Sequence, residues 1–143
     1  MIKVISTEET YSLRQLVLRP GLGIETCYFN GDERESTFHF GYFESKELVG
    51  CVTFMNNTFS AFEQESQLQL RGMAIHENFQ RRGIGTSLLS YLFEENILSS
   101  SKLLWCNARI KALNFYKKVG FKVHGQEFEV PGVGTHIVMF KKV

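Results

Sequence analysis

Gln80-Arg81-Arg82-Gly83-Ile84-Gly85-Thr86 is the stretch that decides the fold, because it lies where a strand should turn into a helix. Residues 67–75 before it alternate polar and apolar side chains, as a strand does, and residues 83–96 after it carry apolar side chains at helical spacing. Glycines at the start of a helix leave its unpaired N–H groups accessible, and the helix dipole adds positive charge there. The stretch therefore predicts a cradle for a phosphate or diphosphate.

The length and charge of the chain limit its class. Its 143 residues predict a single domain, residues 1–143, with one core. The formal net charge is +1, so electrostatics give no reason to expect a nucleic-acid or membrane partner. No apolar run approaches the ~18–20 residues that span a bilayer, and the N-terminus does not resemble a signal peptide.

The cysteines and histidines predict no metal site. Cys27, Cys51 and Cys106 are odd in number, have no zinc-ligand spacing, and favour reduced thiols in a cytoplasmic protein. Apolar or aromatic residues flank each of them, so we expect buried, unreactive thiols. The four histidines are scattered along the chain, so no metal cofactor is expected.

Periodicity and turn residues predict the remaining elements. Strands are expected at residues 2–6, 37–44, 48–55, 67–75, 102–107, 121–124 and 135–142, helices after Thr7, at 83–96 and at 110–119, and a linker at 99–101. A bulge is expected at Gly72-Met73, and Gly120 should end the last helix in a left-handed conformation. This order predicts an α/β (α+β) domain with a mixed, mostly antiparallel central sheet flanked by helices.

The N-terminal region carries a helix and a long loop. Thr7 can cap the first helix, which should bury Leu13, Leu16 and Val17 and end at Pro20-Gly21. Residues 21–36 are then predicted to be irregular. A loop of this length in a compact domain usually serves function.

Two motifs resemble the GNAT superfamily of acyl-CoA N-acyltransferases. Residues 70–75 running into 80–86 are similar to the strand and Q/R-x-x-G-x-G/A loop of that family, and residues 112–121 to its A-x-x-φ-Y-x-x-x-G-F helix end. The predicted buried strand lies between them, as in the family. Residues 107–109 and 132–136 resemble the ElaA-like branch. The resemblance implies a GNAT-like fold.

The resemblance also implies acetyl-CoA, or another short acyl-CoA, as cosubstrate. The cosubstrate would be bound by Gln80, Arg81, Arg82, Gly83, Ile84, Gly85, Thr86 and Asn107, with its diphosphate mainly on the N–H groups of residues 82–86. A solvated basic pair is the alternative for the Arg81 and Arg82 side chains. Met73, Ala74 and Ile75 would pair with the pantetheine amides, and an N–H near Met73 would polarise the thioester carbonyl. Tyr116 is the predicted general acid for the departing thiolate, with a core aromatic as the alternative.

The acceptor is predicted to be a primary amine of a small molecule or peptide. His39, Gln69 and Arg71 are candidates to line its site, with a structural histidine and a salt bridge as the alternatives for His39 and Arg71. An arginine there would suit a carboxylate-bearing acceptor. Acidic residues of the 21–36 loop would either recognise a cationic acceptor or be solvated: Glu25, Asp32, Glu33 and Glu35. His136 lies on the last strand without a decisive pattern.

The predicted function is direct transfer of an acetyl group to the amine in a ternary complex, because no cysteine is placed as a covalent nucleophile. One alternative is a non-catalytic acyl-CoA-binding or sensing domain, which would not need Tyr116. Another is a protein N-acetyltransferase, in which residues 21–36 would form an open groove. Exposed edge strands and the aromatic segment 37–43 are compatible with a homodimer.

Overall fold

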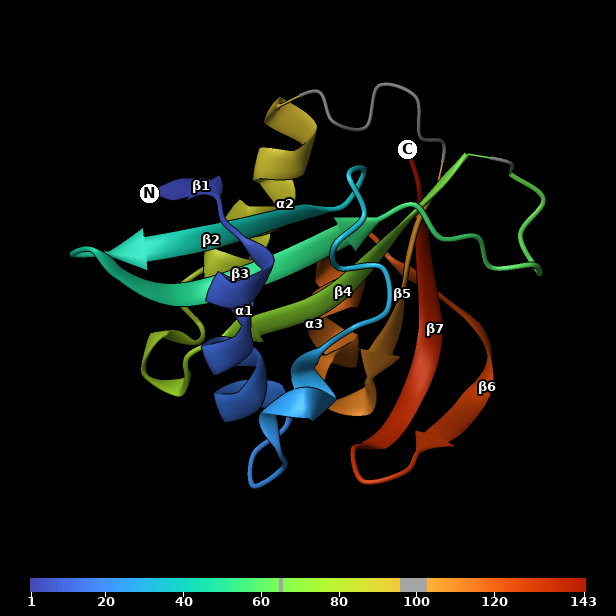
Figure 1. The fold of residues 1–143 in the computed structure, drawn as a ribbon. Helices are drawn as coiled ribbons and strands as arrows, with labels where there is room; N and C mark the ends of the chain where they lie inside the picture. Colours follow the sequence, from blue (N-terminus) through green and yellow to red (C-terminus); the bar gives the residue numbers. More distant parts are fainter. Residues whose placement is uncertain (65, 96–102) are drawn as a thin grey trace. The chain divides into compact units, whose positions relative to one another are not determined.

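The fold is built on a mixed β-sheet. The structure is a computed structural model, which describes residues 1–64, 66–95 and 103–143. Across the sheet the described strands follow the order β1-β2-β3-β4-β5-β7-β6 (Figure 1). The strands are β1 (Ile2–Val4), β2 (Phe38–Glu44), β3 (Glu47–Met55), β4 (Gln67–Ile75), β5 (Leu103–Arg109), β6 (Lys122–Val130) and β7 (Gly134–Lys142), and the α-helices are α1 (Thr7–Leu13), α2 (Ile84–Glu94) and α3 (Leu113–Lys118). β4 and β5 run parallel, while β1–β2, β2–β3, β5–β7 and β6–β7 are antiparallel. The predicted mixed, mostly antiparallel α/β fold is confirmed.

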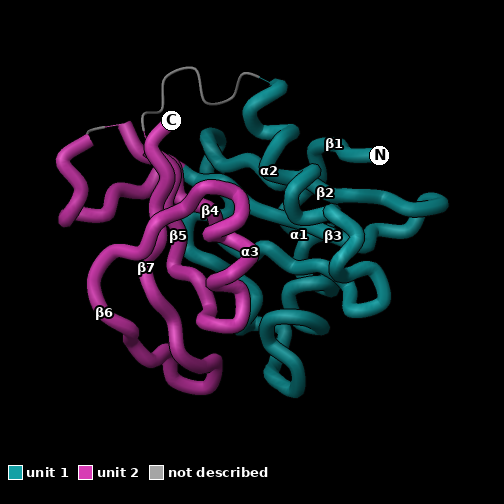
Figure 2. The backbone as a smooth tube through the Cα atoms, turned by 180° about the vertical axis from the view of Figure 1, so that it is seen from behind, with its two compact units in different colours: residues 1–55, 71–97 teal, residues 56–70, 98–143 magenta. Residues whose placement is uncertain are grey.

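Two compact units can be distinguished along the chain (Figure 2). Unit 1 comprises Met1–Met55 and Arg71–Ile97, and unit 2 comprises Asn56–Leu70 and Leu98–Val143. Strand β4 contributes residues 67–70 to unit 2 and residues 71–75 to unit 1. The expectation of a single domain over residues 1–143 stays a prediction.

In unit 1, helices α1 and α2 cover opposite faces of β2 and β3 (Figure 1). Cys51 on β3 packs in a buried cluster with Leu13 of α1. The preceding residue, Gly50, faces the other way, since a Cβ there would meet Ile84 and Leu88 of α2. The β2–β3 turn is tight, because Ser45 and Lys46 have φ values of 47° and 70°.

Helix α2 begins where the sequence predicts, at Ile84 with Gly83 as its N-cap. Four of the five apolar residues that define its predicted stripe are buried: Ile84, Leu88, Leu89 and Leu92. Phe93 is instead 39% exposed, because it is turned about 100° from Leu92 around the helix axis. The predicted helix end at Asn96, the linker at 99–101 and the strand start at Lys102 lie outside the described residues.

Helix α1 has a different cap from the predicted one. The N-cap is Ser6 rather than Thr7: its Oγ accepts a hydrogen bond from the Glu9 N–H at 3.3 Å, and the Glu9 carboxylate accepts one from the Ser6 N–H at 3.0 Å. This reciprocal capping box satisfies two helix-terminal donors, which a cap at Thr7 would not do. Thr7 lies inside the helix and is buried.

The predicted stripe of the first helix is wrong at Leu16. After Leu13 the chain continues as a π-helical segment, η1 (Arg14–Leu18). A π-turn is wider than an α-turn and rotates the following side chains away from the 3.6-residue pattern. Leu16 is 58% exposed, whereas Arg14, which lies on the same helix face as buried Thr7 and Thr10, is fully buried.

The predicted irregular loop 21–36 contains more structure than expected. Residues Ile24–Cys27 form a 3-10 helix, η2, and the chain then turns through residues 30–36. Cys27 at the end of η2 is fully buried. The loop is therefore anchored to the interior of unit 1.

In unit 2, residues 67–70 of β4 pair with residues 103–106 of β5. An aromatic cluster fills one side of this unit, with ring centroids 5.1–5.3 Å apart for the pairs Phe59–Trp105, Phe59–Phe62 and Phe62–Phe140. The Trp105 indole N–H donates a hydrogen bond to the Asn57 carbonyl at 2.9 Å. The core of unit 2 thus contains tilted aromatic rings from β5, from β7 and from residues 56–64.

The C-terminal elements differ from the prediction in length. Helix α3 follows a 3-10 turn, η4 (Ile110–Ala112), and Gly120 ends it with φ = 99°, as predicted. Strand β6 runs on to Val130, so the predicted loop between the last two strands shrinks to residues 131–133. A register shift between His124 and Phe128 accommodates Gly125 within the strand, where the sequence predicts a loop.

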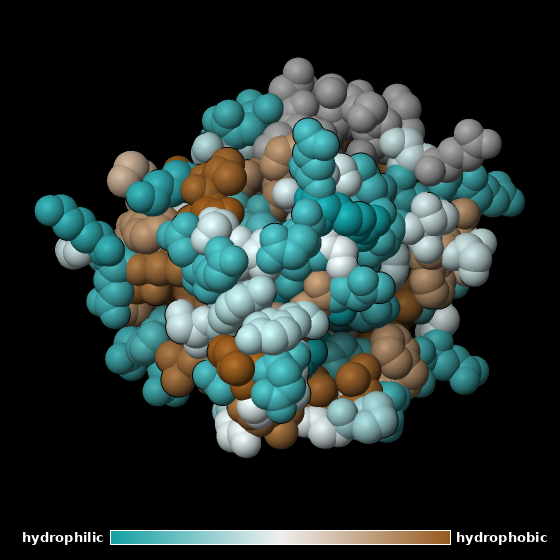
Figure 3. All heavy atoms as spheres, in the orientation of Figure 1, coloured by the Kyte–Doolittle hydropathy of each residue, from teal (hydrophilic) through white to brown (hydrophobic). Residues whose placement is uncertain are grey.

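The homodimer suggested by the aromatic segment 37–43 stays a prediction. The segment forms most of β2, which pairs with β1 on one side and β3 on the other, and Phe40 within it is fully buried. The Phe40 side chain is therefore part of the core of unit 1. On the face drawn in Figure 3, hydrophobic residues are interspersed with hydrophilic ones.

None of the helices within the described ranges has the length and apolarity to cross a membrane.

Candidate active site

The loop before α2 has an unusual backbone. A short 3-10 helix, η3 (Glu77–Phe79), leads into it, and the Gln80 side chain donates a hydrogen bond to the Ile75 carbonyl at 2.9 Å. Arg81 then adopts φ = 65° and Gly83 φ = 80°. A left-handed residue other than glycine costs roughly 1–2 kcal/mol, so the surrounding structure must hold Arg81 in place. The loop is therefore a fixed structure.

The first turn of α2 is left open by the chain. Its N-cap is Gly83, no side chain of the described residues caps it, and no acidic residue occupies the first turn. Ile84 is buried, whereas Thr86 is exposed. The Arg82 guanidinium lies 5.1 Å from the centre of the Phe79 ring. Uncapped N–H donors with two exposed arginines beside them are suited to bind an anion.

The end of β4 carries the residues predicted to meet the pantetheine chain. The parallel register with β5 runs from Gln67–Leu103 to Leu70–Cys106, and Met73, Ala74 and Ile75 lie beyond it. Gly72 has φ = 61° within the strand, the irregularity expected at the predicted bulge. Ala74 is buried, whereas Met73 and Ile75 are partly exposed.

Tyr116 lies on α3 in unit 2 and is 5% exposed. Its ring makes edge-on contacts with Phe115 and Phe121, at centroid distances of 5.1 and 5.3 Å. Burial raises the pKa of Tyr116 well above its ordinary value, and buried Cys106 adds to the effect. The phenol therefore stays protonated at neutral pH and can donate a hydrogen bond.

This pKa shift predicts a loss of stability at high pH. In the unfolded chain the Tyr116 phenol ionises near pH 10, before it does in the folded protein, so its contribution is complete below about pH 10 and is lost above it. Urea midpoints of the wild type should therefore fall more steeply between about pH 10 and 11 than those of Tyr116→Phe. The buried cysteines are common to both proteins. Parallel curves would show that burial does not hold the phenol neutral.

A buried ion pair that the sequence does not reveal organises the N-terminal side of unit 1. The Arg14 guanidinium donates to both Asp32 carboxylate oxygens, at 2.6 and 2.9 Å, and both side chains are almost fully buried. Arg14 also donates to the Cys27 carbonyl at 2.8 Å, and Asp32 accepts from the Phe29 N–H at 2.9 Å. Asp32 thus neither contacts solvent nor recognises a cationic acceptor, which corrects both alternatives for this residue.

His39 is part of the same buried network. Its Nδ1 lies 2.8 Å from the Thr53 hydroxyl, and its Nε2 lies 3.0 Å from the Asp32 carbonyl and 3.1 Å from the Thr7 hydroxyl. Thr53 in turn accepts a hydrogen bond from Arg14. Burial lowers the pKa of His39, which favours the neutral ring. With both ring nitrogens occupied, His39 has the position of a structural histidine.

Loss of Asp32 should destabilise the protein strongly. Asp32→Asn leaves the Arg14 charge buried without its counterion, so the free energy of unfolding should fall by about 3–5 kcal/mol. Equilibrium urea unfolding measures this change. Glu33→Gln, at an exposed neighbour in the same loop, should change it by less than about 0.5 kcal/mol. Equal losses in the two variants would contradict a central role for the pair.

The other predicted acceptor residues lie in different surroundings. Arg71 is half-buried in unit 1, with its guanidinium 4.6 Å from the centre of the Phe29 ring. Gln69 is buried in unit 2 and accepts a hydrogen bond from the Asn57 side chain at 2.7 Å. Asn107 is exposed on β5, and His136 is buried on β7 with its Nδ1 2.9 Å from the Gly134 carbonyl.

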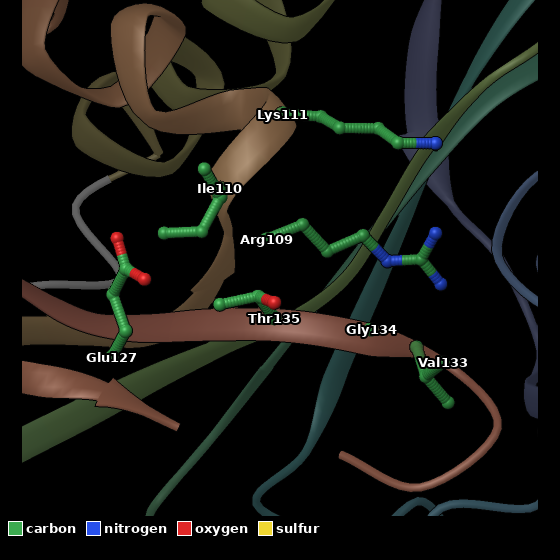
Figure 4. Close-up of a pocket in the computed structure, with 7 residues that line it drawn as sticks. All are labelled: Arg109, Ile110, Lys111, Glu127, Val133, Gly134 and Thr135. Atoms are coloured by element: carbon green, nitrogen blue, oxygen red, sulfur yellow. The ribbon is translucent and has the colours of Figure 1, made fainter. Parts of the chain in front are cut away.

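A pocket of about 280 Å³ lies within unit 2 (Figure 4). Its lining comes from the end of β5, from η4 and from the β6–β7 hairpin: Arg109, Ile110, Lys111, Glu127, Val133, Gly134 and Thr135. Figure 4 shows the Arg109 and Lys111 side chains extending toward the same side. The pocket depends on the β6–β7 hairpin, in which β6 is longer than the sequence predicts.

The three cysteines are free and buried, as predicted. Burial raises the pKa of the Cys51 thiol to about 12 and also raises that of Cys106. Such thiols carry almost no thiolate at neutral pH and are poor nucleophiles. Within residues 1–64, 66–95 and 103–143, no group of three or more His, Cys, Asp or Glu side chains is placed to hold a metal ion.

The sequence is similar to those of known proteins. Residues 26–143 match the acetyltransferase (GNAT) domain. The chain is 36% identical over 140 residues to the uncharacterized N-acetyltransferase YitI of Bacillus subtilis (strain 168), covering 98% of this chain and 94% of that protein. The chain therefore belongs to the GNAT family and is an acyl-CoA-dependent acetyltransferase.

Solved structures support the fold. An aminoglycoside 6'-N-acetyltransferase complexed with coenzyme A has a TM-score of 0.76 at 15% identity, covering 99% of this chain and 96% of that chain. Escherichia coli ElaA has a TM-score of 0.71 at 19% identity, covering 99% of each chain. At such identities the likeness extends to the fold alone.

Proposed function

We propose that this protein transfers the acetyl group of acetyl-CoA directly to a primary amine, with both substrates bound together. The observation that carries the proposal is the first turn of α2, which no described side chain caps. The loop that precedes this turn has left-handed backbone conformations at Arg81 and Gly83. N–H donors there, with the Arg81 and Arg82 side chains, would bind the diphosphate of coenzyme A. The acetyltransferase solved with coenzyme A shares this fold.

A negative charge in the first turn should separate cosubstrate binding from folding. In Thr86→Glu the new carboxylate favours the helix dipole, so stability should stay equal or rise by about 0.3–1 kcal/mol. The same carboxylate repels a diphosphate, so the dissociation constant of acetyl-CoA should rise at least about 10-fold in calorimetry.

Ser90→Glu is the matched control for this variant. Ser90 is exposed on the same helix, more than one turn farther along, so its charge lies away from the proposed anion site. Acetyl-CoA affinity should stay within about 2-fold of the wild type. Unchanged affinity in Thr86→Glu as well would place the diphosphate elsewhere.

The chemistry requires one bond to form and one to break. The neutral amine attacks the thioester carbonyl carbon, the C–S bond breaks with its electron pair on sulfur, and the amine loses its proton to solvent. We infer that an N–H near Met73, beside the irregular backbone at Gly72, stabilises the carbonyl oxygen as charge develops. The neighbouring backbone of Ala74 and Ile75 would pair with the pantetheine amides, and Asn107 would add a contact.

Tyr116 is proposed to stabilise the departing thiolate by hydrogen bonding. Its pKa is raised, whereas a coenzyme A thiol has a pKa near that of cysteine, about 8.5, so full proton transfer is uphill by about 1.4 kcal/mol for each pKa unit. A charge-assisted hydrogen bond avoids this cost. The thiolate would then take its proton from solvent.

Removal of the Tyr116 hydroxyl should slow turnover. Tyr116→Phe should lower kcat about 10- to 100-fold while the KM for acetyl-CoA changes little, because the hydrogen bond strengthens as the thiolate forms. Thiol release from acetyl-CoA with a responsive amine measures both constants. Tyr91→Phe, the same change at a ring packed against Phe40, should leave both unchanged. Equal kcat in the two variants would return Tyr116 to the core.

Direct transfer is supported by the state of the cysteines. All three are buried, and the raised pKa values of Cys51 and Cys106 disfavour an acyl-cysteine intermediate. Membership of the GNAT family favours an enzyme over an acyl-CoA-binding module. The reduced thiols also support a cytoplasmic location, which stays a prediction, as does a homodimer.

A further inference from the structure

Three arginines of unit 1 gather around one phenyl ring. The guanidinium carbons of Arg14, Arg71 and Arg19 lie 3.9, 4.6 and 5.6 Å from the centre of the Phe29 ring. Arg14 and Arg19 come from η1 and its C-terminal end, Phe29 from the loop after η2, and Arg71 from β4. Segments distant in sequence thus bring three positive charges together.

The close approach depends on Gly72. A Cβ at this position would lie 3.0 Å from the Phe29 ring and 3.1 Å from the Arg14 Nε. Because Gly72 lacks that atom, the ring and the buried guanidinium can pack directly against β4. The arginine cluster is therefore built into the strand that also carries Met73.

The cluster contains fewer negative charges than positive ones. Asp32 forms a bidentate pair with Arg14, which is the ion pair found among the described residues. Arg19 donates to the Leu18 carbonyl at 3.2 Å, and Arg71 makes no hydrogen bond within the described parts of the chain. The five N–H donors of the Arg71 guanidinium thus have no hydrogen-bond acceptor among residues 1–64, 66–95 and 103–143.

Desolvation makes this excess charge expensive. Burial lowers the pKa of both Arg71 and Arg19, and the nearby Arg14 lowers both further. Asp32 acts against this effect at Arg71, but its carboxylate is already shared with Arg14. A half-buried guanidinium in such surroundings gains from a bound anion. Arg71, Arg19 and Phe29 all remain partly exposed, so an anion can reach them.

We propose that Arg71, assisted by Arg19, binds a carboxylate of the acceptor, which makes the acceptor a small amino acid-like molecule with both an amine and a carboxylate. This inference rests on the proposed acetyl transfer. Guanidinium groups match carboxylates with two parallel hydrogen bonds. A bound carboxylate also leaves the amine as the reactive end.

The spacing along β4 sets the size of the acceptor. Arg71 and Met73 are two residues apart, so at about 3.3 Å per residue their Cα atoms are separated by no more than roughly 7 Å. The Met73 N–H is the proposed oxyanion donor. The carboxylate bound by Arg71 and the amine that reacts beside Met73 should therefore be only a few bonds apart, as in an α-amino acid or a short amino acid with a terminal amine. A protein acceptor would rarely present its amine and a carboxylate so close together, so the cluster favours a small molecule.

The test compares matched pairs of acceptors. The proteinogenic amino acids, β-alanine and γ-aminobutyrate are each assayed with acetyl-CoA beside the amine that lacks the carboxylate, with release of coenzyme A as the readout. We expect at least one acid to exceed its paired amine about 10- to 100-fold in kcat/KM. Arg71→Gln should reduce that preference to within about 3-fold, mainly by raising the KM of the acid.

Conservative and control variants separate binding from folding. Arg71→Lys keeps the charge but loses the planar fork, so it should retain part of the preference. Arg19→Gln should reduce the preference less than Arg71→Gln does. Lys122→Gln removes one positive charge from an exposed site on β6 and should leave the preference unchanged. Thermal unfolding of each variant confirms that it is folded.

Three outcomes would overturn the inference while the proposed function stands. They are equal or greater activity with the amines that lack a carboxylate, an equal loss of both activities in Arg71→Gln, and binding of acetyl-CoA without acetylation of any carboxylate-bearing amine. A protein that neither binds acetyl-CoA in calorimetry nor acetylates any amine would overturn the proposed function, and this inference with it.

Discussion

The bidentate pair between Arg14 and Asp32 is the interaction on which the N-terminal side of unit 1 depends. It joins the π-helical segment after α1 to the loop that follows η2. It also fixes that loop internally, because Arg14 binds the Cys27 carbonyl and Asp32 binds the Phe29 N–H. A buried ion pair adds little net stability, but loss of one partner leaves an uncompensated buried charge. The bond from the Phe29 N–H to Asp32 also helps to position the Phe29 ring, around which the three arginines gather.

The features proposed to act in catalysis are distributed over the chain in an ordered way. Unit 1 holds the anion cradle at α2, residues 71–75 of β4 and the arginine cluster. Unit 2 holds Tyr116 and the pocket at the β6–β7 hairpin. Strand β4 belongs to both units. The half of β4 in unit 1 bears Arg71 and Met73, so one short stretch of backbone carries both the proposed carboxylate contact and the proposed oxyanion donor.

Much of the fold follows from local sequence signals. The bounds of β4, the start of α2 at its glycine and the left-handed end of α3 all rest on short-range chemistry, in which periodicity and glycine conformation act within a few residues. The family motifs lie in these same segments, so the cradle and Tyr116 could be proposed without a structure.

The acceptor side could not be predicted in the same way. Arg14 is a charged residue on the buried face of the first helix, in line with Thr7 and Thr10, and nothing in its neighbourhood in the sequence marks it as buried. Its partner Asp32 lies 18 residues away in a loop rich in other acids, so no periodicity links the two. No periodicity links Phe29 and Arg19 to Arg14 or Arg71 either, so the sequence does not show that these residues lie together. Of the three arginines around the Phe29 ring, only Arg71 could be singled out, because it shares a strand with the family motif.

The left-handed backbone at Arg81 has a consequence for how the cosubstrate is captured. Because its surroundings hold this loop in an unfavourable conformation, its conformational entropy is already reduced before a nucleotide binds. Association then loses little conformational entropy in this segment. The proposed cradle is thus preorganised, and coenzyme A would bind to it without reshaping the loop.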